Sequence, residues 1–401
     1  MGQFTLVCGS CGAMQSSPYS PFCSFCGKMT EVAFDLDKAQ LHDSPNPYER
    51  FFDLIPVKNK DFLPKNITYT PCIHATKLGE QLGMPHLHLK NETALPTGTT
   101  KYRMAAVSLP YLYESGVRHF CTSSTGNSST AYAQLMPNIP GLKMSLFTGS
   151  EFRNRVNYAT NPQIHHYVLR NGTFVEAFDC AADFAREHGY TSERGFFNVG
   201  RREGLKLAFF EATDQIPEPI DWYVQAVSSA MGVYGTYKGA KELLAMGHIK
   251  QLPHLLCVQQ ESCAPMVNAW KDNAEIVGEH HVVRNPVGIA KAILRGDPSR
   301  VYPYMRKIVK ESTGDFEAVS EADIRATQKL VKELEGIDIC FSASAAVAGL
   351  INAVRSGRIE KDDCVMINLT GSDRTGGEVS DDITVLDKIN NHWEKSVNQT
   401  L

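Results

Sequence analysis

The stretch Leu95-Pro-Thr-Gly-Thr-Thr-Lys101-Tyr-Arg103 decides how the rest of the chain is interpreted. It follows a short apolar segment, 86–90, that predicts a strand, and it leads into a helix-like segment, 102–114. A loop rich in turn and hydroxyl residues therefore places Lys101 at the start of a helix. The positive helix end and Arg103 favour a neutral amine, which is a nucleophile that forms imines with carbonyls. Taken alone, the stretch fits an ordinary surface lysine beside a turn better, because single lysines near loops are common.

The composition is that of a soluble globular protein. The chain has 401 residues, enough for two or three lobes, with 43% hydrophobic and 21% charged residues and a net charge of −4. This balance indicates neither a nucleic-acid nor a membrane-surface partner. The sequence contains no signal-peptide pattern and no apolar run of transmembrane length. Most of the 11 cysteines are scattered singly, which is typical of reduced thiols, so we expect a cytoplasmic protein.

Four cysteines near the N-terminus form two Cys-x-x-Cys pairs. Each pair can form a metal-binding knuckle, and four thiolates complete the tetrahedral shell of a structural zinc ion. Gly12 and Gly27 suit the tight turn after each knuckle. Two disulfides or free thiols are the alternative. The ribbon has Lys28 as its one basic residue, which favours a structural or docking role over nucleic-acid binding. The predicted zinc ligands are Cys8, Cys11, Cys23 and Cys26.

From residue 70 onward, short apolar runs alternate with amphipathic segments of helical length, which predicts an open α/β fold. Strands are expected at 118–122, 143–147, 164–169, 222–227, 255–258, 337–341 and 364–369. Helices are expected at 127–136, 180–187, 235–244, 265–274, 321–335 and 343–356.

Three loops that follow predicted strands have the residues of a ligand site. Ser123-Ser-Thr-Gly-Asn-Ser-Ser-Thr130 and Ser228-Ser-Ala-Met-Gly-Val-Tyr-Gly-Thr236 each lead into a helix, where backbone N–H groups and the positive helix end can bind a carboxylate or a phosphate. Asn127 can hydrogen-bond a phenolic oxygen. In the third loop, Thr370 can hydrogen-bond a heterocyclic nitrogen and Arg374 can hold an anion. The first loop could instead be a hydroxyl-rich helix cap, and the third could be an ordinary strand-end turn.

These motifs, taken in order, resemble those of fold-type II pyridoxal-phosphate (PLP) enzymes, most of all the threonine synthase branch. Pro96-Thr-Gly-Thr-Thr-Lys-Tyr-Arg103 resembles the family's Pro-Thr-Gly-Ser-Phe-Lys-Asp-Arg, and Ser124-Thr-Gly-Asn127 resembles its Ser-Thr-Gly-Asn. Further matches are Lys90-Asn-Glu92, Arg202-Glu-Gly-Leu-Lys206, Gln260-Glu-Ser-Cys-Ala-Pro265 and Leu369-Thr-Gly371.

The resemblance implies a role for each matching residue. Lys101 forms an imine with PLP and then acts as general base and acid. The implied cofactor-binding residues are Lys101, Asn127, Ser228, Ser229, Ala230, Met231, Gly232, Val233 and Thr370. The implied substrate-binding residues are Thr100, Ser124, Thr125, Gly126, Arg155 and Arg374.

The implied activity is that of a lyase or synthase, by β- or γ-elimination or replacement on an O-activated amino acid that we expect to be O-phosphorylated. Several positions depart from the family pattern: Tyr102 stands in place of Asp, Thr100 in place of Phe, and the 228–235 loop lacks Gly-Asn-x-Gly-Asn. These departures leave open a cysteate-synthase-like enzyme or another enzyme of a specialised pathway. The intact Lys101 and Asn127 disfavour a non-catalytic ligand-binding relative, and the acidic balance disfavours a zinc-ribbon nucleic-acid protein.

The implied architecture is two open three-layer α/β lobes of the tryptophan synthase β-like type, with PLP in the cleft between them. We expect a zinc ribbon over 1–34, an extended arm over 35–69, a large PLP-binding lobe over 70–104 and 201–388, a small mobile lobe over 105–200, and a tail over 389–401. A homodimer is expected because cyclic pairs are the commonest assembly.

Overall fold

The computed structural model describes residues 4–374 and 377–401. Its contacts divide the chain into two compact units. Unit 1 comprises 4–68, 101–204, 374 and 377–401, and unit 2 comprises 69–100 and 205–373. One boundary falls directly before Lys101 and another directly before Arg374, so both predicted site residues begin a segment of unit 1.

The N-terminal part of unit 1 is a two-stranded ribbon followed by an arm with little regular structure. Strands β1 (Phe4–Cys8) and β2 (Thr30–Phe34) pair antiparallel. The arm contains the short helix α1 (Pro47–Arg50) and 3₁₀ turns at 52–54 and 60–62. The Glu114 carboxylate accepts hydrogen bonds from the backbone N–H groups of Lys58 (2.8 Å) and Asn59 (2.7 Å), which ties the arm to the end of helix α3 (Lys101–Glu114).

The sheet of unit 1 has the strand order β14-β13-β7-β6-β5-β8 and is parallel except for β14. Helix α5 covers one face with a stripe of Ala177, Ala181 and Ala185, spaced four residues apart, against an apolar cluster that includes Phe147. The strands are β5 (His119–Ser123), β6 (Lys143–Gly149), β7 (Ile164–Leu169), β8 (Thr191–Ser192), β13 (Ile383–Ile389) and β14 (His392–Lys395). The helices that follow α3 are α4 (Asn127–Leu135), α5 (Phe174–Glu187) and α6 (Val199–Leu205), with 3₁₀ turns at 136–138, 150–155 and 195–197.

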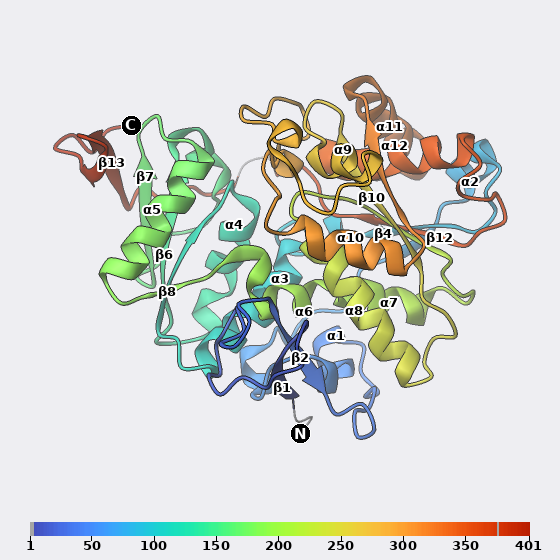
Figure 1. Cartoon of the computed structure of the whole chain (residues 1–401), viewed down its shortest axis with the longest axis horizontal. Coiled ribbons are helices and arrows are strands. Elements are labelled where there is room, and N and C mark those ends of the chain that lie inside the picture. Colours follow the sequence, from blue (N-terminus) through green and yellow to red (C-terminus); the bar gives the residue numbers. More distant parts are fainter. Residues whose placement is uncertain (1–3, 375–376) are drawn as a thin grey trace. The chain divides into compact units, whose positions relative to one another are not determined.

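The sheet of unit 2 has the order β11-β10-β9-β12-β4-β3 and is parallel except for β3. Helices α11 and α12 lie on one face, and α7, α8 and α10 lie on the other (Figure 1). Because both faces are covered, the central strands β9 and β12 are buried along their whole length. The strands are β3 (Cys72–His74), β4 (Leu87–Asn91), β9 (Trp222–Ala226), β10 (His254–Gln260), β11 (Asp315–Val319) and β12 (Val365–Leu369). The helices are α2 (Thr76–Leu82), α7 (Leu207–Gln215), α8 (Met231–Ala245), α9 (Pro265–Lys271), α10 (Tyr302–Glu311), α11 (Glu321–Glu335) and α12 (Phe341–Arg355), with 3₁₀ turns at 92–94, 279–281 and 291–293.

The prediction of a strand at 337–341 is wrong. This segment forms no strand: Ile337 and Ile339 are buried in the core of unit 2, and α12 begins at Phe341. The Cys340 N–H donates to the Gly371 carbonyl (3.0 Å) instead of joining a ladder. The edge next to β10 is occupied by β11, whose residues the sequence did not mark as a strand.

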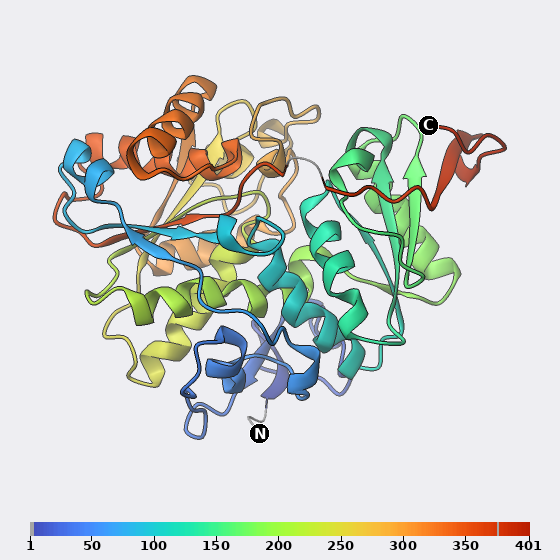
Figure 2. The same ribbon diagram turned by 180° about the vertical axis from the view of Figure 1, so that it is seen from behind.

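The C-terminal segment also differs from the predicted arrangement. Residues 383–388, expected in the large lobe, belong to β13, which pairs in parallel with β7 of unit 1. The expected tail contains β14, which forms a hairpin with β13 (Figure 2, red). The two strands are half-exposed, so their sequence lacks the apolar run that marks a buried strand.

In the part of the chain that the structure describes, no helix is both long enough and apolar enough to cross a lipid bilayer.

Candidate active site

Lys101 is the first residue of α3 and lies half-buried in unit 1. Burial, followed by the positive charge of Arg201, lowers the pKa of Lys101 to about 8. Within residues 4–374 and 377–401, the Lys101 side chain forms no hydrogen bond or ion pair. A substantial fraction of this amine is therefore neutral near physiological pH, which the ordinary lysine pKa of about 10.4 does not allow. This environment is that of a nucleophilic or proton-transferring lysine, and it does not fit an ordinary surface lysine.

Arg201, on α6, is held by a buried acidic partner. Glu193 and Arg201 are 1% and 4% exposed, and Arg201 donates from Nε and from Nη2 (2.6 Å) to the two carboxylate oxygens. The Tyr132 hydroxyl donates to the same carboxylate at 3.0 Å. This network could not be predicted from the sequence, because its members are separated by up to 69 residues and belong to no short motif.

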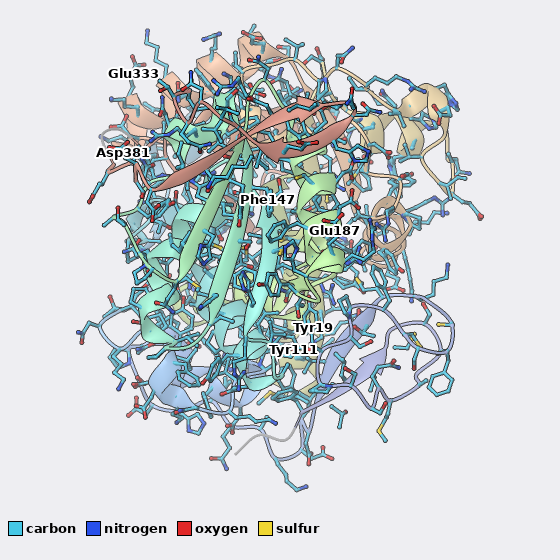
Figure 3. All side chains as sticks on the ribbon, turned by 90° about the vertical axis from the view of Figure 1, so that its left-hand side faces the viewer. Tyr19, Tyr111, Phe147, Glu187, Glu333 and Asp381 are labelled. Atoms are coloured by element: carbon cyan, nitrogen blue, oxygen red, sulfur yellow. The ribbon has the colours of Figure 1, made fainter. Side chains whose placement is uncertain are left out.

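The N-terminal ribbon contacts the same region. The Tyr19 hydroxyl donates to the backbone carbonyl of Glu193 (3.1 Å), and its ring packs 6.2 Å from that of Tyr111 on α3, centroid to centroid (Figure 3). The Tyr111 hydroxyl donates to the Pro18 carbonyl at 3.2 Å. The ribbon therefore packs directly on the helix that begins with Lys101.

The loop Ser124–Gly126 adopts the geometry of a close approach at the start of α4. Gly126 has φ +124°, and a Cβ there would lie 2.6 Å from the Arg155 carbonyl oxygen, so glycine is required. The Ser124 hydroxyl accepts from the N–H groups of Gly126 (3.1 Å) and Ser129 (3.2 Å), so it satisfies one N–H of the first turn of α4, although the N-cap position itself is occupied by Gly126. The Ser123 hydroxyl is buried and has no hydrogen-bond partner in the part of the chain that the structure describes, as expected where a ligand completes the site.

Arg374 fixes the orientation of Asn127 within unit 1. Its Nη1 donates to Asn127 Oδ1 (2.7 Å), and its Nη2 donates to the Arg155 carbonyl (2.9 Å). Its Nε donates to Asn157 Oδ1 at 3.2 Å. Because the Asn127 amide oxygen is engaged by a guanidinium, its remaining polar group is the NH₂ donor, which suits an acceptor such as a phenolate oxygen.

In unit 2, the loop after β9 leads into α8, which begins four residues before the helix predicted at 235–244. Ala230 adopts a left-handed conformation (φ +58°), and α8 begins at the next residue, Met231. The first N–H groups of this helix have no intrahelical acceptor and can bind an anion such as a phosphate. A left-handed conformation at a residue other than glycine costs about 1–3 kcal/mol and is concentrated at functional sites.

The loop before Lys101 is hydrogen-bonded to the residues that follow β12, and both segments belong to unit 2. The Thr100 N–H donates to the Thr370 carbonyl (2.9 Å), and the Ser372 N–H donates to the Gly98 carbonyl (2.9 Å). The hydroxyl groups of Thr99 and Thr100 are buried and have no hydrogen-bond partner within residues 4–374 and 377–401. Unit 2 thus supplies a candidate phosphate loop and, in the loop before Lys101, two buried hydroxyls that no described residue satisfies.

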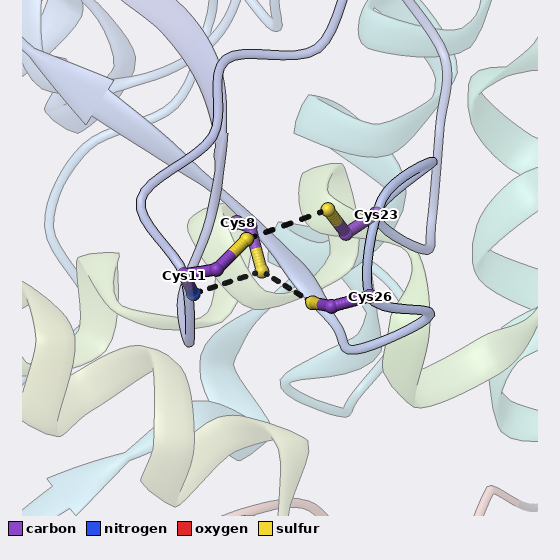
Figure 4. A group of neighbouring side chains, drawn as sticks. All are labelled: Cys8, Cys11, Cys23 and Cys26. Atoms are coloured by element: carbon purple, nitrogen blue, oxygen red, sulfur yellow. Dashed lines mark hydrogen bonds between the residues drawn. The ribbon is translucent and has the colours of Figure 1, made fainter.

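The four N-terminal cysteines converge on one point (Figure 4). Cys8 Sγ lies 3.4 Å from Cys26 Sγ, Cys11 Sγ lies 3.8 Å from Cys23 Sγ, and all four sulfurs are within 4.8 Å of one another. Four sulfurs about 2.3 Å from a tetrahedral zinc ion are roughly 3.8 Å apart, so the spacing fits zinc. Gly12 (φ +71°) and Gly27 (φ +68°) make the left-handed turns predicted after the knuckles.

Comparisons with known proteins identify the family. The family model described as "Pyridoxal-phosphate dependent enzyme" matches residues 63–371. A threonine synthase from Methanosarcina acetivorans is 30% identical over 400 residues, covering 96% of this chain and 96% of that protein. A cysteate synthase from Methanosarcina mazei is 26% identical over 389 residues, covering 92% of each chain. Among solved structures, maize serine racemase shares the fold with a TM-score of 0.63 at 16% identity, covering 80% of this chain and 96% of that chain.

The family match spans most of the chain and includes Lys101, the 124–127 loop and the 228–233 loop. The chain therefore belongs to the family of pyridoxal-phosphate-dependent enzymes, as a threonine synthase-like member of fold type II.

Proposed function

We propose that this enzyme catalyses β- or γ-elimination or replacement on an O-phosphorylated amino acid, in the manner of a threonine synthase. The observation that carries the proposal is the Lys101 amine at the start of α3, with a pKa lowered to about 8 and no hydrogen-bond partner in the described structure. PLP, when bound, supplies the electron sink that stabilises negative charge at the amino-acid Cα. Lys101 then has the proton affinity needed to remove and return the Cα proton near neutral pH.

Each unit has groups that would bind the cofactor. In unit 2, the N–H groups at Met231, Gly232 and Val233 and the hydroxyls of Ser228 and Ser229 would hold the phosphate, and Thr370 would face the pyridine nitrogen. In unit 1, the Asn127 amide N–H₂ would donate to the phenolic oxygen, because Arg374 engages its oxygen. The unpartnered buried hydroxyls of Thr99, Thr100 and Ser123 support the presence of a bound polar ligand near these loops.

The substrate would be held by the loop at the start of α4 and by nearby cations. Ser124, Thr125 and Gly126 would bind the carboxylate, with the Thr125 N–H as a donor, at the positive end of α4. Thr100, Arg155 and Arg374 would contact the substrate phosphate, although the Arg374 guanidinium is already committed to three acceptors within unit 1. This assignment favours a substrate with two anionic groups, a carboxylate and a phosphate.

A cysteate-synthase-like activity is the second candidate, and the 26% identity to a cysteate synthase over 389 residues supports it. The two candidates differ in substrate: the first takes a phosphorylated homoserine, in which the leaving group is on Cγ, and the second takes a phosphorylated serine, in which it is on Cβ. A β-replacement that makes cysteate needs a sulfite nucleophile, whereas the first reaction needs water.

The experiment is a visible absorption spectrum of the PLP-loaded protein before and after addition of phosphohomoserine or phosphoserine, with phosphate release measured in parallel. We expect an imine band in the wild type that shifts with one of the two substrates, and no such band in Lys101→Ala. Lys77→Ala, at an exposed position of α2, is the matched control and should behave as the wild type. A wild type that shows no band with added PLP would contradict the proposal, and phosphate release from phosphoserine with sulfite would favour the second candidate.

The ribbon cysteines are proposed to hold one structural zinc ion, and the assembly is proposed to be a homodimer in the cytoplasm. The converging sulfurs support the zinc site. Light scattering coupled to gel filtration tests the dimer, since a mass near 44.4 kDa would indicate a monomer.

A further inference from the structure

A second group of metal-ligating side chains lies in unit 2, apart from the ribbon and from the proposed catalytic residues. A ring nitrogen of His88, a Glu218 carboxylate oxygen and Cys364 Sγ all lie within 4.8 Å of one another. His88 is on β4, Glu218 is in the connection between α7 and β9, and Cys364 directly precedes β12. Three different elements of the fold therefore deliver one imidazole, one carboxylate and one thiol to the same place.

Strand pairing explains why these side chains meet. Leu87 of β4 is paired with Val365 of β12, and His88 is paired with Met366. Because side chains alternate across a sheet, Cys364 and Met366 share the face of His88. The Cys364 N–H donates to Asp221 Oδ2 (2.8 Å), which fixes the backbone that carries the thiol.

Two polar atoms of this group lack a hydrogen-bond partner among the described residues. His88 is 7% exposed, and the two atoms are its buried Nε2 and the buried Glu218 Oε2. These two atoms are 4.0 Å apart, too far for a hydrogen bond. A tetrahedral zinc ion would hold such a nitrogen and oxygen roughly 3.4 Å apart, so its binding would draw the two side chains together by about 0.6 Å. A buried imidazole nitrogen without a partner is uncommon in a native structure and indicates a missing ligand.

Another cluster that contains histidines differs from this group, because its buried imidazole is fully hydrogen-bonded. Asp272, His280 and His281 also lie within 4.8 Å of one another. There, however, His281 Nδ1 accepts from the Gly278 N–H (2.9 Å) and its Nε2 contacts Asp272 Oδ2 at 2.9 Å. Both ring nitrogens of His281 are therefore satisfied without an ion.

We infer that His88, Glu218 and Cys364 form a second zinc-binding site. The mixed nitrogen, oxygen and sulfur ligands match the borderline-soft character of Zn²⁺, and three protein ligands leave a fourth position for water. His86 Nδ1 lies 3.6 Å from the other carboxylate oxygen of Glu218 and can orient it from outside the site. The Glu218 side chain is 42% exposed, which provides an entry path for the ion.

The position of the site indicates a structural or regulatory role. The ligands lie where β4 and β12 begin, whereas Thr370 follows the last residue of β12. Six residues of extended chain from Cys364 to Thr370 cover about 20 Å. The ion would therefore link β4, β12 and the α7–β9 connection at one end of the sheet without contacting the reacting atoms.

The test counts zinc ions per full-length chain by elemental mass spectrometry, after loading with zinc and dialysis. We expect two in the wild type, one in Glu218→Gln and in Cys364→Ser, and one in the ribbon variant Cys11→Ser. Asp272→Asn, in the satisfied histidine cluster, is the matched control and should keep two. Glu218→Gln is the decisive variant because its half-exposed side chain is not needed for core packing, and circular dichroism verifies its fold.

Two results would overturn the inference: a single zinc ion that Cys11→Ser removes, or two zinc ions retained by both Glu218→Gln and Cys364→Ser. A single zinc ion that is lost in Glu218→Gln but kept in Cys11→Ser would support this site and contradict the ribbon site.

Discussion

Arg374 donates a 2.7 Å hydrogen bond from Nη1 to Oδ1 of Asn127, across 247 residues of sequence. An asparagine amide can rotate to exchange its oxygen and nitrogen, and a cation at the oxygen prevents this. The Asn127 NH₂ group is therefore the one available to a ligand.

Replacement of Arg374 should weaken cofactor binding through Asn127. In Arg374→Met the amide loses its charged partner, and we expect the Kd for PLP to rise roughly three- to tenfold, in keeping with about 1 kcal/mol for an oriented hydrogen bond. Absorbance titration of the apo protein with PLP measures this. Arg186→Met, at an exposed position of α5, is the control for loss of an arginine. An unchanged Kd in Arg374→Met would show that Asn127 needs no such support.

The lowered pKa of Lys101 predicts the pH dependence of imine formation. Only the neutral amine attacks the PLP aldehyde, so the rate should be low at pH 6, half-maximal near pH 8 and level above about pH 9. The sign follows from protonation: below pH 8 most of the amine carries a proton and is unreactive. Stopped-flow absorbance of apo protein mixed with PLP measures the rate of imine formation. The same reaction of PLP with an Nα-blocked lysine is the control, because it shows how protonation of PLP itself changes the rate with pH. A rate that still rises between pH 9 and 10.5 would mean that Lys101 titrates as an ordinary lysine.

Gly126 should tolerate no side chain. In Gly126→Ala the new Cβ would lie 2.6 Å from the Arg155 carbonyl oxygen, in a backbone conformation with φ +124°. We expect a loss of about 2–4 kcal/mol of stability from overpacking and backbone strain together. Gly116→Ala is the matched control, because Gly116 also has a positive φ (+90°) but no neighbouring atom within 4 Å of its Cβ position. Thermal unfolding compares the two, and equal midpoints would rule out the steric clash.

Removal of zinc from the ribbon should destabilise the packing around α3. The ribbon contributes Tyr19 and the Pro18 carbonyl to contacts with Tyr111 and Glu193, and apo zinc-binding segments of this size are usually unfolded. We expect Cys11→Ser or a chelator to lower the thermal midpoint by several degrees, which reflects a loss of a few kcal/mol. Cys180→Ser, at a half-buried single cysteine on α5, is the control. Identical melting curves with and without zinc would contradict a structural role.

Much of the fold was predictable because it depends on local pattern. The strand at 164–169 and the helix at 321–335 have the bounds expected from periodicity. The glycine turns at Gly12 and Gly27 were also predictable, since only glycine adopts a left-handed conformation at little cost. The strand expected at 337–341 was wrong, because an apolar run as short as this one does not reveal whether a neighbouring strand is present to pair with it.

The sequence by itself determined which residue types are available: a lysine after a hydroxyl-rich turn, two cysteine pairs, and helix-starting loops that can bind anions. Each of these patterns consists of residues close together in the sequence, so it can be identified without knowing the fold. Only the tertiary structure decided the environment of each group. It placed Glu193 on Arg201, Arg374 on Asn127, and Cys364 beside His88. Such contacts join residues far apart in the chain, and the pairing of strands and the packing of helices set them rather than any local preference.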